Sequence, residues 1–416
     1  MELEKYSFGL GDRFGLQGKA LLQAIIEAKH LGVHLTPVWN KSFREHAIVG
    51  SSPADTRGEA DEAVRDLRWQ AAYFVDADHI TRHNVGLFIE HSDFFTIDVA
   101  DYLNKPPDPT DLTRFIQRHA EYSGQLRIPG LEETFEVEQG RLAEIGRRYL
   151  AAIHEAQRVY ELIRAQKHES PFVVELSMDE AARPLEPVEL FFILAEVAVR
   201  GLPISTVAPK FIGRLKKGVD YEDDLEAFTS NFSRILAVLR FAKEQFPLRP
   251  DLKLSVHSGS DKFSLYGPIG ALLRRTGMGL HIKTAGTTWL EELGGLAEGG
   301  EEGLALAKEI YRQAYQRLAE LVSPYAAVVD IHPARLPHPD VVARWGQENF
   351  VAALEHSPGN PCYKRDFRQL LHLAYKVAAE AGTRYTELVL KYRDIIADRV
   401  TRNILERHIR PLFLGD

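Results

Sequence analysis

The sequence predicts an α/β fold of the TIM-barrel type, a (β/α)8 barrel in which parallel strands alternate with helices. Three observations predict it. Short apolar runs with strand character recur along the 416 residues. Amphipathic stretches with helical spacing lie between most of these runs. Several runs end in polar side chains, which is where parallel α/β proteins place their active sites. A doubly wound open sheet is the alternative fold for the same pattern.

Nine apolar runs are candidate strands, and a closed barrel of this type has eight. Either the last run lies outside the barrel or one of the nine is not a strand. The stretch GKALLQAIIEAKHLG, between the first two runs, shows the expected helical spacing and ends in a glycine. The nine runs span residues 6–10, 33–39, 72–78, 94–100, 171–177, 202–208, 252–258, 279–284 and 326–332.

Two regions interrupt the alternation of strands and helices. Residues at about 101–170 contain the turn-rich NKPPDPTD and a long charged helical pattern, and we expect a helical insertion there. Residues at about 333–416 are mostly helical in pattern, which predicts a helical C-terminal extension. Because we find no fixed-period repeat and no Gly/Ser linker, we expect one barrel domain over residues 1–416.

Composition narrows the classes of function. A formal net charge of -8 gives no basic field for nucleic acid or anionic lipid. The chain has no apolar stretch long enough to span a membrane and no signal-like N-terminus, so we expect a cytoplasmic protein. A single cysteine, Cys362, excludes an intrachain disulfide and a thiolate metal site, so any metal must use histidines and carboxylates. No nucleotide-binding motif is present, and a homo-oligomer is compatible with the sequence.

Histidines follow the ends of several predicted strands. His79, His257 and His281 are the candidate metal ligands, and His332 follows the same pattern as a reserve ligand. Three protein ligands with open positions for substrate or water are typical of a catalytic metal site. Any single one of the 16 histidines is more often an ordinary hydrogen-bonded residue, so the prediction depends on their coincidence beside acids.

Two acids are candidates for proton transfer. Asp78 adjoins a candidate ligand, and a cation nearby would keep it ionised. Glu175 lies inside an otherwise apolar strand, where desolvation would raise its pKa and suit it to donate a proton. The alternative for Glu175 is a buried ion pair with a Lys or Arg on a neighbouring strand. Further polar residues at strand ends are candidates for binding the substrate: Arg13, Ser258, Asp261, Lys262 and Lys283. The alternative for Lys262 and Lys283 is pairing with the acids.

Several segments together resemble the tagaturonate epimerase family, metal-dependent bacterial enzymes that interconvert tagaturonate and fructuronate. The resemblance extends from about residue 8 to about residue 376, and HSGSDKFS with HIKTAGT is its most specific part. The segments are GLGDRFG, DADH, VELSMDE, KFIGRLKKGVDYEDDLEAF, SVHSGSDKFS, HIKTAGTTWLE and FRQLLHLAY.

The resemblance implies a barrel-type metalloenzyme that acts on a sugar or sugar acid. It implies Asp78 as proton acceptor and Glu175 as proton donor, with His79, His257 and His281 as ligands of a divalent cation (Zn, Ni, Co, Fe or Mn). The two ketohexuronates differ at C4, whose hydrogen is not acidic because C4 is β to the ketone. This chemistry predicts retro-aldol cleavage and re-addition. Tagatose and fructose are alternative substrates.

Two other functions are compatible with the same residues. A metal-dependent aldose-ketose isomerase would use the same acids for a shift between C1 and C2, and it would yield an aldehyde sugar. A sugar-acid binding protein could keep the fold without catalysis, but it has no need for a base beside a metal.

Overall fold

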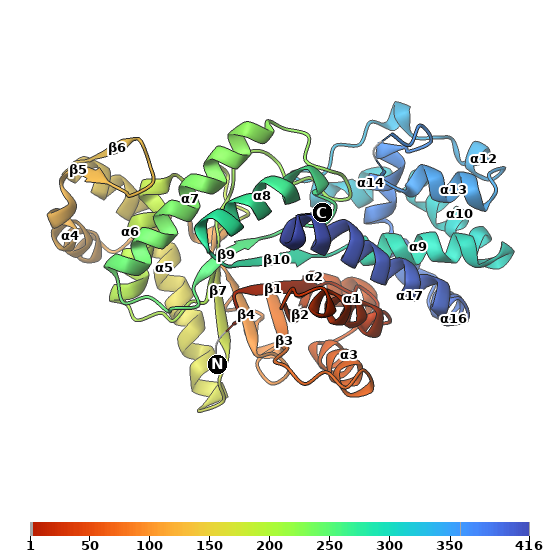
Figure 1. The fold of residues 1–416 in the computed structure, drawn as a ribbon, viewed down its shortest axis with the longest axis horizontal. Coiled ribbons are helices and arrows are strands. Elements are labelled where there is room, and N and C mark those ends of the chain that lie inside the picture. The colour runs from red at the N-terminus through yellow and green to blue at the C-terminus, as the bar shows by residue number, and fades with distance from the viewer. Residues whose placement is uncertain (1–2, 358, 416) are drawn as a thin grey trace.

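The computed structural model describes residues 3–357 and 359–415, and its centre is a closed barrel of eight parallel strands (Figure 1). The strand order around the barrel is β1-β10-β9-β8-β7-β4-β3-β2, and β1 pairs with β10 to close it. The predicted TIM-type barrel is therefore confirmed. The strands are β1 (Tyr6–Leu10), β2 (Thr36–Ser42), β3 (Phe74–Ile80), β4 (Phe94–Asp98), β7 (Val173–Ser177), β8 (Thr206–Ala208), β9 (Lys253–Val256) and β10 (Leu280–Thr284).

Eight of the nine predicted runs contribute strands, and the ninth, at 326–332, does not. It lies between two short 3₁₀ helices, η4 (Ser323–Tyr325) and η5 (Pro333–Arg335). Pairing of β1 with β10 leaves no open edge for it to join. Its backbone instead contacts neighbouring loops and helices, since Val328 O accepts a hydrogen bond from the backbone of Lys217. An apolar run alone therefore does not identify a strand.

Six of the longer helices in the described residues lie between successive barrel strands, and a seventh, α9, follows the last strand, β10. Together they surround the barrel. Local sequence explains their ends: Ser52 and Asp55 form a capping box at the start of α3, and Gly277 in the left-handed conformation ends α8. The apolar run PVELFFILAEVAV makes α6 almost entirely buried. The helices are α1 (Gly18–His30), α3 (Pro53–Asp66), α5 (Gln139–Lys167), α6 (Pro187–Val199), α7 (Leu225–Gln245), α8 (Phe263–Thr276) and α9 (Thr287–Gly299), with α2 (Phe43–Val49) preceding α3.

The segment between β4 and β7 contains a small subassembly at one end of the molecule (Figure 1). It consists of α4 (Pro109–Arg118) and an antiparallel hairpin, β5 (Gly124–Arg127) with β6 (Thr134–Val137). The sequence analysis did not predict the hairpin, because its two strands have four residues each and are mostly exposed. The long charged pattern that follows is α5, which returns the chain from β4 to β7 as a barrel helix.

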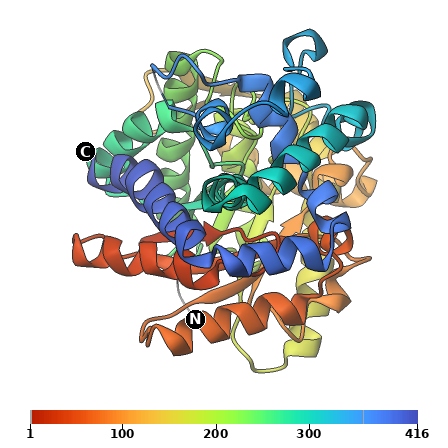
Figure 2. The same ribbon diagram turned by 90° about the vertical axis from the view of Figure 1, so that its right-hand side faces the viewer.

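The C-terminal region is helical, as predicted, and packs on α9 and α1 (Figures 1 and 2). Figure 2 shows α17 and the π-helical η6 running along α1. We propose that this region and the barrel form one domain, because their buried side chains belong to one continuous apolar cluster. Its helices are α10 (Glu301–Gln316), α11 (Leu318–Val322), α12 (Pro339–Val342), α13 (Gln347–Leu354), α14 (Arg365–Leu373), α15 (Tyr375–Glu380), α16 (Thr383–Lys391), α17 (Arg393–Arg402) and η6 (Asn403–Leu414).

Within residues 3–357 and 359–415, no helix is both long enough and apolar enough to cross a membrane.

A buried acid links the barrel to the C-terminal helices. Glu292 of α9 is fully buried, and its oxygens accept hydrogen bonds from Gln17 Nε2 at 3.0 Å and from Tyr385 of α16 at 2.7 Å. Burial, reinforced by the charge of Asp12, raises the pKa of Glu292 to about 8. This carboxyl group therefore mostly retains its proton at neutral pH.

We predict that Glu292→Gln gains stability relative to the wild type as the pH rises from 5 to 8. The unfolded chain releases this proton near the ordinary pKa of 4.5, whereas the folded protein retains it up to about 8. The stability that the protonated carboxyl contributes is fully present below pH 4.5 and is lost as the pH rises towards 8. The stability difference should grow by up to about 1.4 kcal/mol per pH unit in urea unfolding. Parallel pH curves for the two proteins would contradict the assignment, and the exposed Glu302→Gln serves as the control.

Candidate functional site

The carboxyl end of the barrel is filled by charged groups around one lysine. Lys283 Nζ of β10 lies 2.7 Å from Asp76 Oδ2, 2.8 Å from Asp78 Oδ1 and 3.0 Å from Glu175 Oε1. All four side chains are buried. Asp76 and Asp78 are two residues apart on β3 and so share its inward face. The structure therefore contains a buried ion pair between Glu175 and Lys283, which come from different strands. Such an ion pair was the alternative interpretation of both residues.

This arrangement separates the pKa values of the two aspartates. Burial raises the pKa of Asp76 to about 7, with Asp78 and Glu175 adding to the effect against the pull of Lys283. For Asp78, burial is outweighed by Lys283, His79 and His257, which lower its pKa to about 2. The strand end thus holds one carboxyl group that can carry a proton near neutral pH and one that stays ionised.

Glu175 does not have the raised pKa that desolvation alone predicts. Burial acts in that direction, but Lys283 and His257 outweigh it and hold the pKa well below its ordinary value. Its oxygen Oε1 lies 2.6 Å from His257 Nε2, and Oε2 accepts a hydrogen bond from Thr206 at 2.7 Å. The expected raised pKa belongs to Asp76 instead, a residue that the sequence analysis did not select.

His79 reaches the site through an irregularity in β3. The register between β3 and β4 shifts after Ala77, and His79 has a positive φ of 52°. In a regular strand His79 would face away from Asp78, and the left-handed conformation redirects it. Its Nδ1 lies 3.2 Å from Asp98 Oδ2 at the end of β4. Positive φ is uncommon for a residue other than glycine and is found at functional sites.

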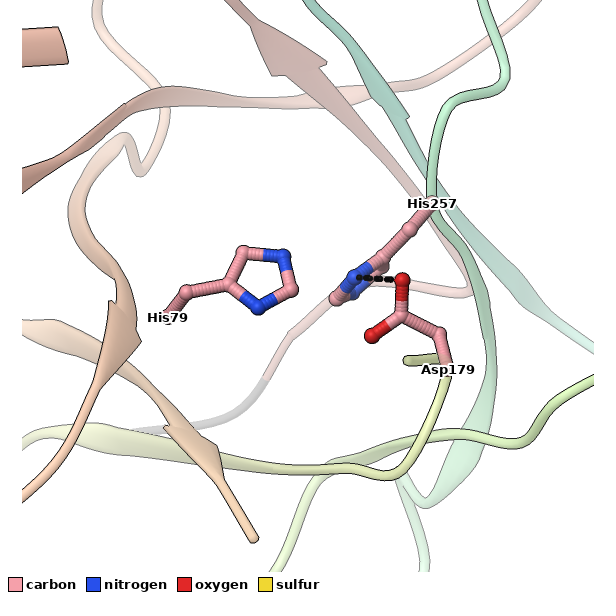
Figure 3. A group of neighbouring side chains, drawn as sticks. All are labelled: His79, Asp179 and His257. Carbon is pink, nitrogen blue, oxygen red and sulfur yellow. Dashed lines mark ion pairs between the residues drawn. The ribbon is translucent and has the colours of Figure 1, made fainter. Parts of the chain in front are cut away.

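His257 lies opposite His79 and follows β9. Figure 3 shows His79 pointing towards His257 and Asp179, and the two imidazole rings are 5.0 Å apart between centroids. His257 Nδ1 lies 3.3 Å from Asp179 Oδ2. Ligand atoms of His79, Asp179 and His257 all lie within 4.8 Å of one another, which is close enough for one metal ion.

The chemistry of these three side chains fits a divalent cation. Each histidine has one ring nitrogen beside another carboxylate, Asp98 for His79 and Glu175 for His257. Metal-binding histidines commonly make such a contact, which fixes the ring and its tautomer. The other nitrogen of each ring remains for a ligand bond. Two imidazoles and a carboxylate are a donor set that zinc and other transition metals accept.

His281 and His332 lie outside this group. His281 is two residues before Lys283 on β10, so it shares the inward face at a deeper level, where its Nδ1 contacts Ser7 Oγ at 2.9 Å. Burial lowers the pKa of His281 to about 3, so the ring is neutral. His332 is half exposed and lies 3.7 Å from Asp330. The structure brings together two of the three predicted histidines and adds Asp179, which the sequence analysis did not select.

Two of the predicted substrate-binding residues are used inside the protein. Lys262 Nζ donates to three backbone carbonyls, those of Lys216, Val219 and Ser260, at 2.7 to 3.0 Å. Asp261 is fully buried and accepts a hydrogen bond from Arg368 of α14 at 2.9 Å. These contacts occupy both side chains, and they stabilise the loop after β9.

The remaining two candidates for binding the substrate are Arg13 and Ser258. Arg13 is buried, its Nη1 lies 3.1 Å from Glu45 Oε1, and its guanidinium lies 3.9 Å above the ring of Tyr375. Ser258 follows His257 with a positive φ of 51° and is partly exposed. This backbone conformation turns the chain directly after His257.

Fold and site together define a (β/α)8-barrel protein with a charged site at the carboxyl ends of its strands, and sequence comparison identifies its family. A family model described as tagaturonate epimerase matches residues 1–409, so the chain belongs to the tagaturonate epimerase family. Members of this family are carbohydrate isomerases. The resemblance that the sequence motifs indicated is thereby confirmed.

Individual relatives agree with this assignment. The tagaturonate/fructuronate epimerase of Thermotoga maritima is 28% identical over 382 residues, which are 89% of this chain and 72% of the relative. A native crystal structure and a glycerol complex of the fructuronate-tagaturonate epimerase UxaE from Cohnella laeviribosi each have a TM-score of 0.78 at 22% identity. Each comparison covers 98% of this chain and 82% of the other. These structures share the fold.

We predict that Lys283→Met destabilises the protein by about 3–5 kcal/mol at pH 7, because three buried carboxyl groups lose their common partner. Methionine keeps most of the length of the side chain, so the loss of charge dominates. The deficit should shrink towards pH 5, where the carboxylates take up protons. Urea unfolding at both pH values measures this effect. Lys391→Met, which removes a lysine from an exposed pair with Glu302, should have little effect. A similar small effect at Lys283 would contradict the prediction.

Proposed function

We propose that this protein interconverts tagaturonate and fructuronate by epimerisation at C4. The observation that carries the proposal is the pairing of Asp78 and Glu175 on one ammonium, Lys283, beside the group His79, Asp179 and His257. Membership of the tagaturonate epimerase family supports the choice of substrate.

The chemistry of the substrate favours cleavage of a carbon–carbon bond. C4 is β to the C2 ketone, so its hydrogen is not acidic and cannot be removed directly. In the proposed mechanism Asp78 accepts the proton of the C4 hydroxyl group. The bond between C3 and C4 then breaks and yields an aldehyde at C4 and an enediolate over C2 and C3. Rotation of the aldehyde and re-addition from its other face form the epimer, with the same atoms and electrons.

The two acids have complementary places in this mechanism. Asp78 is ionised, as a proton acceptor must be, and its buried side chain is still 11% exposed. Glu175 is the proposed donor to the new C4 alkoxide. Because its pKa is held low, its Oε1 first takes up a proton from Lys283 Nζ at 3.0 Å, and the proton that Asp78 has accepted returns to Lys283, 2.8 Å away. Because the reaction runs in both directions, acceptor and donor exchange roles in the reverse reaction.

We further propose that His79, His257 and Asp179 hold a divalent cation. When bound, such a cation supplies Lewis-acid polarisation of a carbonyl oxygen, which is useful where negative charge develops on the ketone. The chain's own contribution is to orient the two imidazoles through Asp98 and Glu175. Zn, Ni, Co, Fe and Mn all accept this donor set.

We predict that the purified, metal-loaded protein converts fructuronate to tagaturonate, observed by NMR. EDTA should abolish the conversion and an added divalent ion should restore it. Asp78→Asn and Glu175→Gln should each lower kcat by about 100-fold or more, since positioned acids and bases contribute 10²–10⁴-fold. Circular dichroism checks that both variants fold.

Several outcomes would overturn this proposal. An aldehyde sugar as product would indicate the aldose-ketose isomerase, and no product with any ion would favour the binding protein. If turnover in D₂O placed deuterium at C4, retro-aldol cleavage would be excluded, because that scheme never breaks the C4–H bond.

The identity of the third ligand gives a separate prediction. We expect Asp179→Asn, His79→Ala and His257→Ala to lose bound divalent metal, measured by elemental analysis after dialysis. His281→Gln should keep it, because His281 contacts Ser7 at a deeper level of the barrel. Loss of metal in His281→Gln with retention in Asp179→Asn would instead support the three-histidine set that the family resemblance implies.

A further inference from the structure

Lys217 lies on the loop after β8. Hydrogen bonds hold its backbone, whereas its ammonium group forms none with the described residues. The backbone N–H of Lys217 donates to Val328 O at 2.8 Å, and its carbonyl accepts from Gln369 Nε2 at 2.9 Å. The next residue, Gly218, has a positive φ of 72°, and its carbonyl accepts a hydrogen bond from Arg368. Three hydrogen bonds from the C-terminal region therefore hold this loop position.

The ammonium group of Lys217 differs from those of the other lysines around the site. Lys283 lies among three carboxylates, Lys262 donates to three carbonyls, and Lys216 pairs with Glu222 and Asp330. By contrast, nothing in the described parts of the chain forms a hydrogen bond or ion pair with Lys217 Nζ. Lys217 is only partly buried, so water can hydrate its ammonium group and an anionic ligand can replace that water.

Both cationic and acidic side chains surround Lys217. The hydroxyl groups of Tyr325 and Tyr375 are 2.8 Å apart and join the two rings into one platform. Arg13 lies 3.9 Å above the ring of Tyr375, and Arg44 and Lys217 lie 5.7 and 5.9 Å from the ring of Tyr325. Glu45 pairs with Arg13. Three cations thus share this platform.

This platform lies at the same end of the barrel as the candidate metal group, because Lys217 follows β8 and Asp179 follows the neighbouring strand β7. Burial lowers the pKa of Lys217, and the charge of Arg13 lowers it further, while Glu45, Glu180 and Asp179 act in the opposite direction. Asp179 belongs to the group that faces His79 and His257. A ligand bound at that group can therefore extend a charged end towards Lys217.

We propose that Lys217 binds the terminal carboxylate of the sugar acid and is the residue that selects a uronate over a neutral ketohexose. This inference rests on the proposed function, because it assigns one end of the substrate at the same site. Arg13 is held by Glu45 and Tyr375, so it supplies positive potential, and the free ammonium of Lys217 supplies the direct hydrogen bond.

The test compares Lys217→Met, Lys217→Arg and the wild type with fructuronate and fructose. A charge-assisted hydrogen bond to the carboxylate predicts that Lys217→Met raises the KM for fructuronate about 10–100-fold with little change in kcat. Lys217→Arg should recover most of the loss. The inhibition constant of fructose, which has a hydroxymethyl group in place of the carboxylate, should stay unchanged. Arg214→Met removes one exposed positive charge from the same loop and is the matched control.

Equal losses for fructuronate and fructose in Lys217→Met, or an unchanged KM for fructuronate, would overturn the inference. Failure of the proposed function is a different result, in which the wild type leaves fructuronate unchanged. In that case calorimetric binding of fructuronate to the wild type and to Lys217→Met still tests the subsite. Loss of affinity only in Lys217→Met would support it, and equal or absent binding would reject it.

Discussion

The site depends on one buried ammonium. Lys283 holds Asp76, Asp78 and Glu175 at the carboxyl end of the barrel, where three carboxyl groups without a cation would repel one another in a medium that barely screens charge. Because the three acids contact the same nitrogen at different depths, their protonation differs. Asp78 stays ionised while Asp76 can keep a proton near neutral pH. A barrel interior that is usually apolar is thereby turned into a charged centre.

The C-terminal helices stabilise the loops that carry the site. Arg368 of α14 is almost completely buried, and it donates to Asp261 after β9 and to the carbonyl of Gly218 after β8. One guanidinium therefore fixes two loops at the same end of the barrel. The loop after β9 contains two residues with positive φ, Ser258 and Asp261, and such conformations persist only where surrounding contacts enforce them. Packing outside the barrel thus determines the backbone next to His257.

Strand ends were predictable from the sequence, but side-chain partners were not. The rule that polar residues gather at the carboxyl ends of parallel strands placed Asp78 and His257 at one end of the barrel, and Glu175 was selected as the acid inside an apolar strand. It could not reveal depth, so His281 was grouped with histidines that lie above it. Glu175 was expected to have a raised pKa because its cationic partner comes from β10, far away in the sequence. Asp179 was not selected because its contact with His257 exists only in three dimensions.

The charged groups of the site are arranged in an order that distinguishes the two ends of a substrate. Carboxyl groups and Lys283 occupy the barrel interior, the histidines and Asp179 lie beside them, and the platform of Tyr325 and Tyr375 gathers cations next to Asp179. A substrate with a ketone at one end and a carboxylate at the other matches this order in one orientation, with the carboxylate at the platform and the ketone at the histidines. In the proposed function, the arrangement of charge that selects a sugar acid therefore also fixes which end of the sugar meets the histidines.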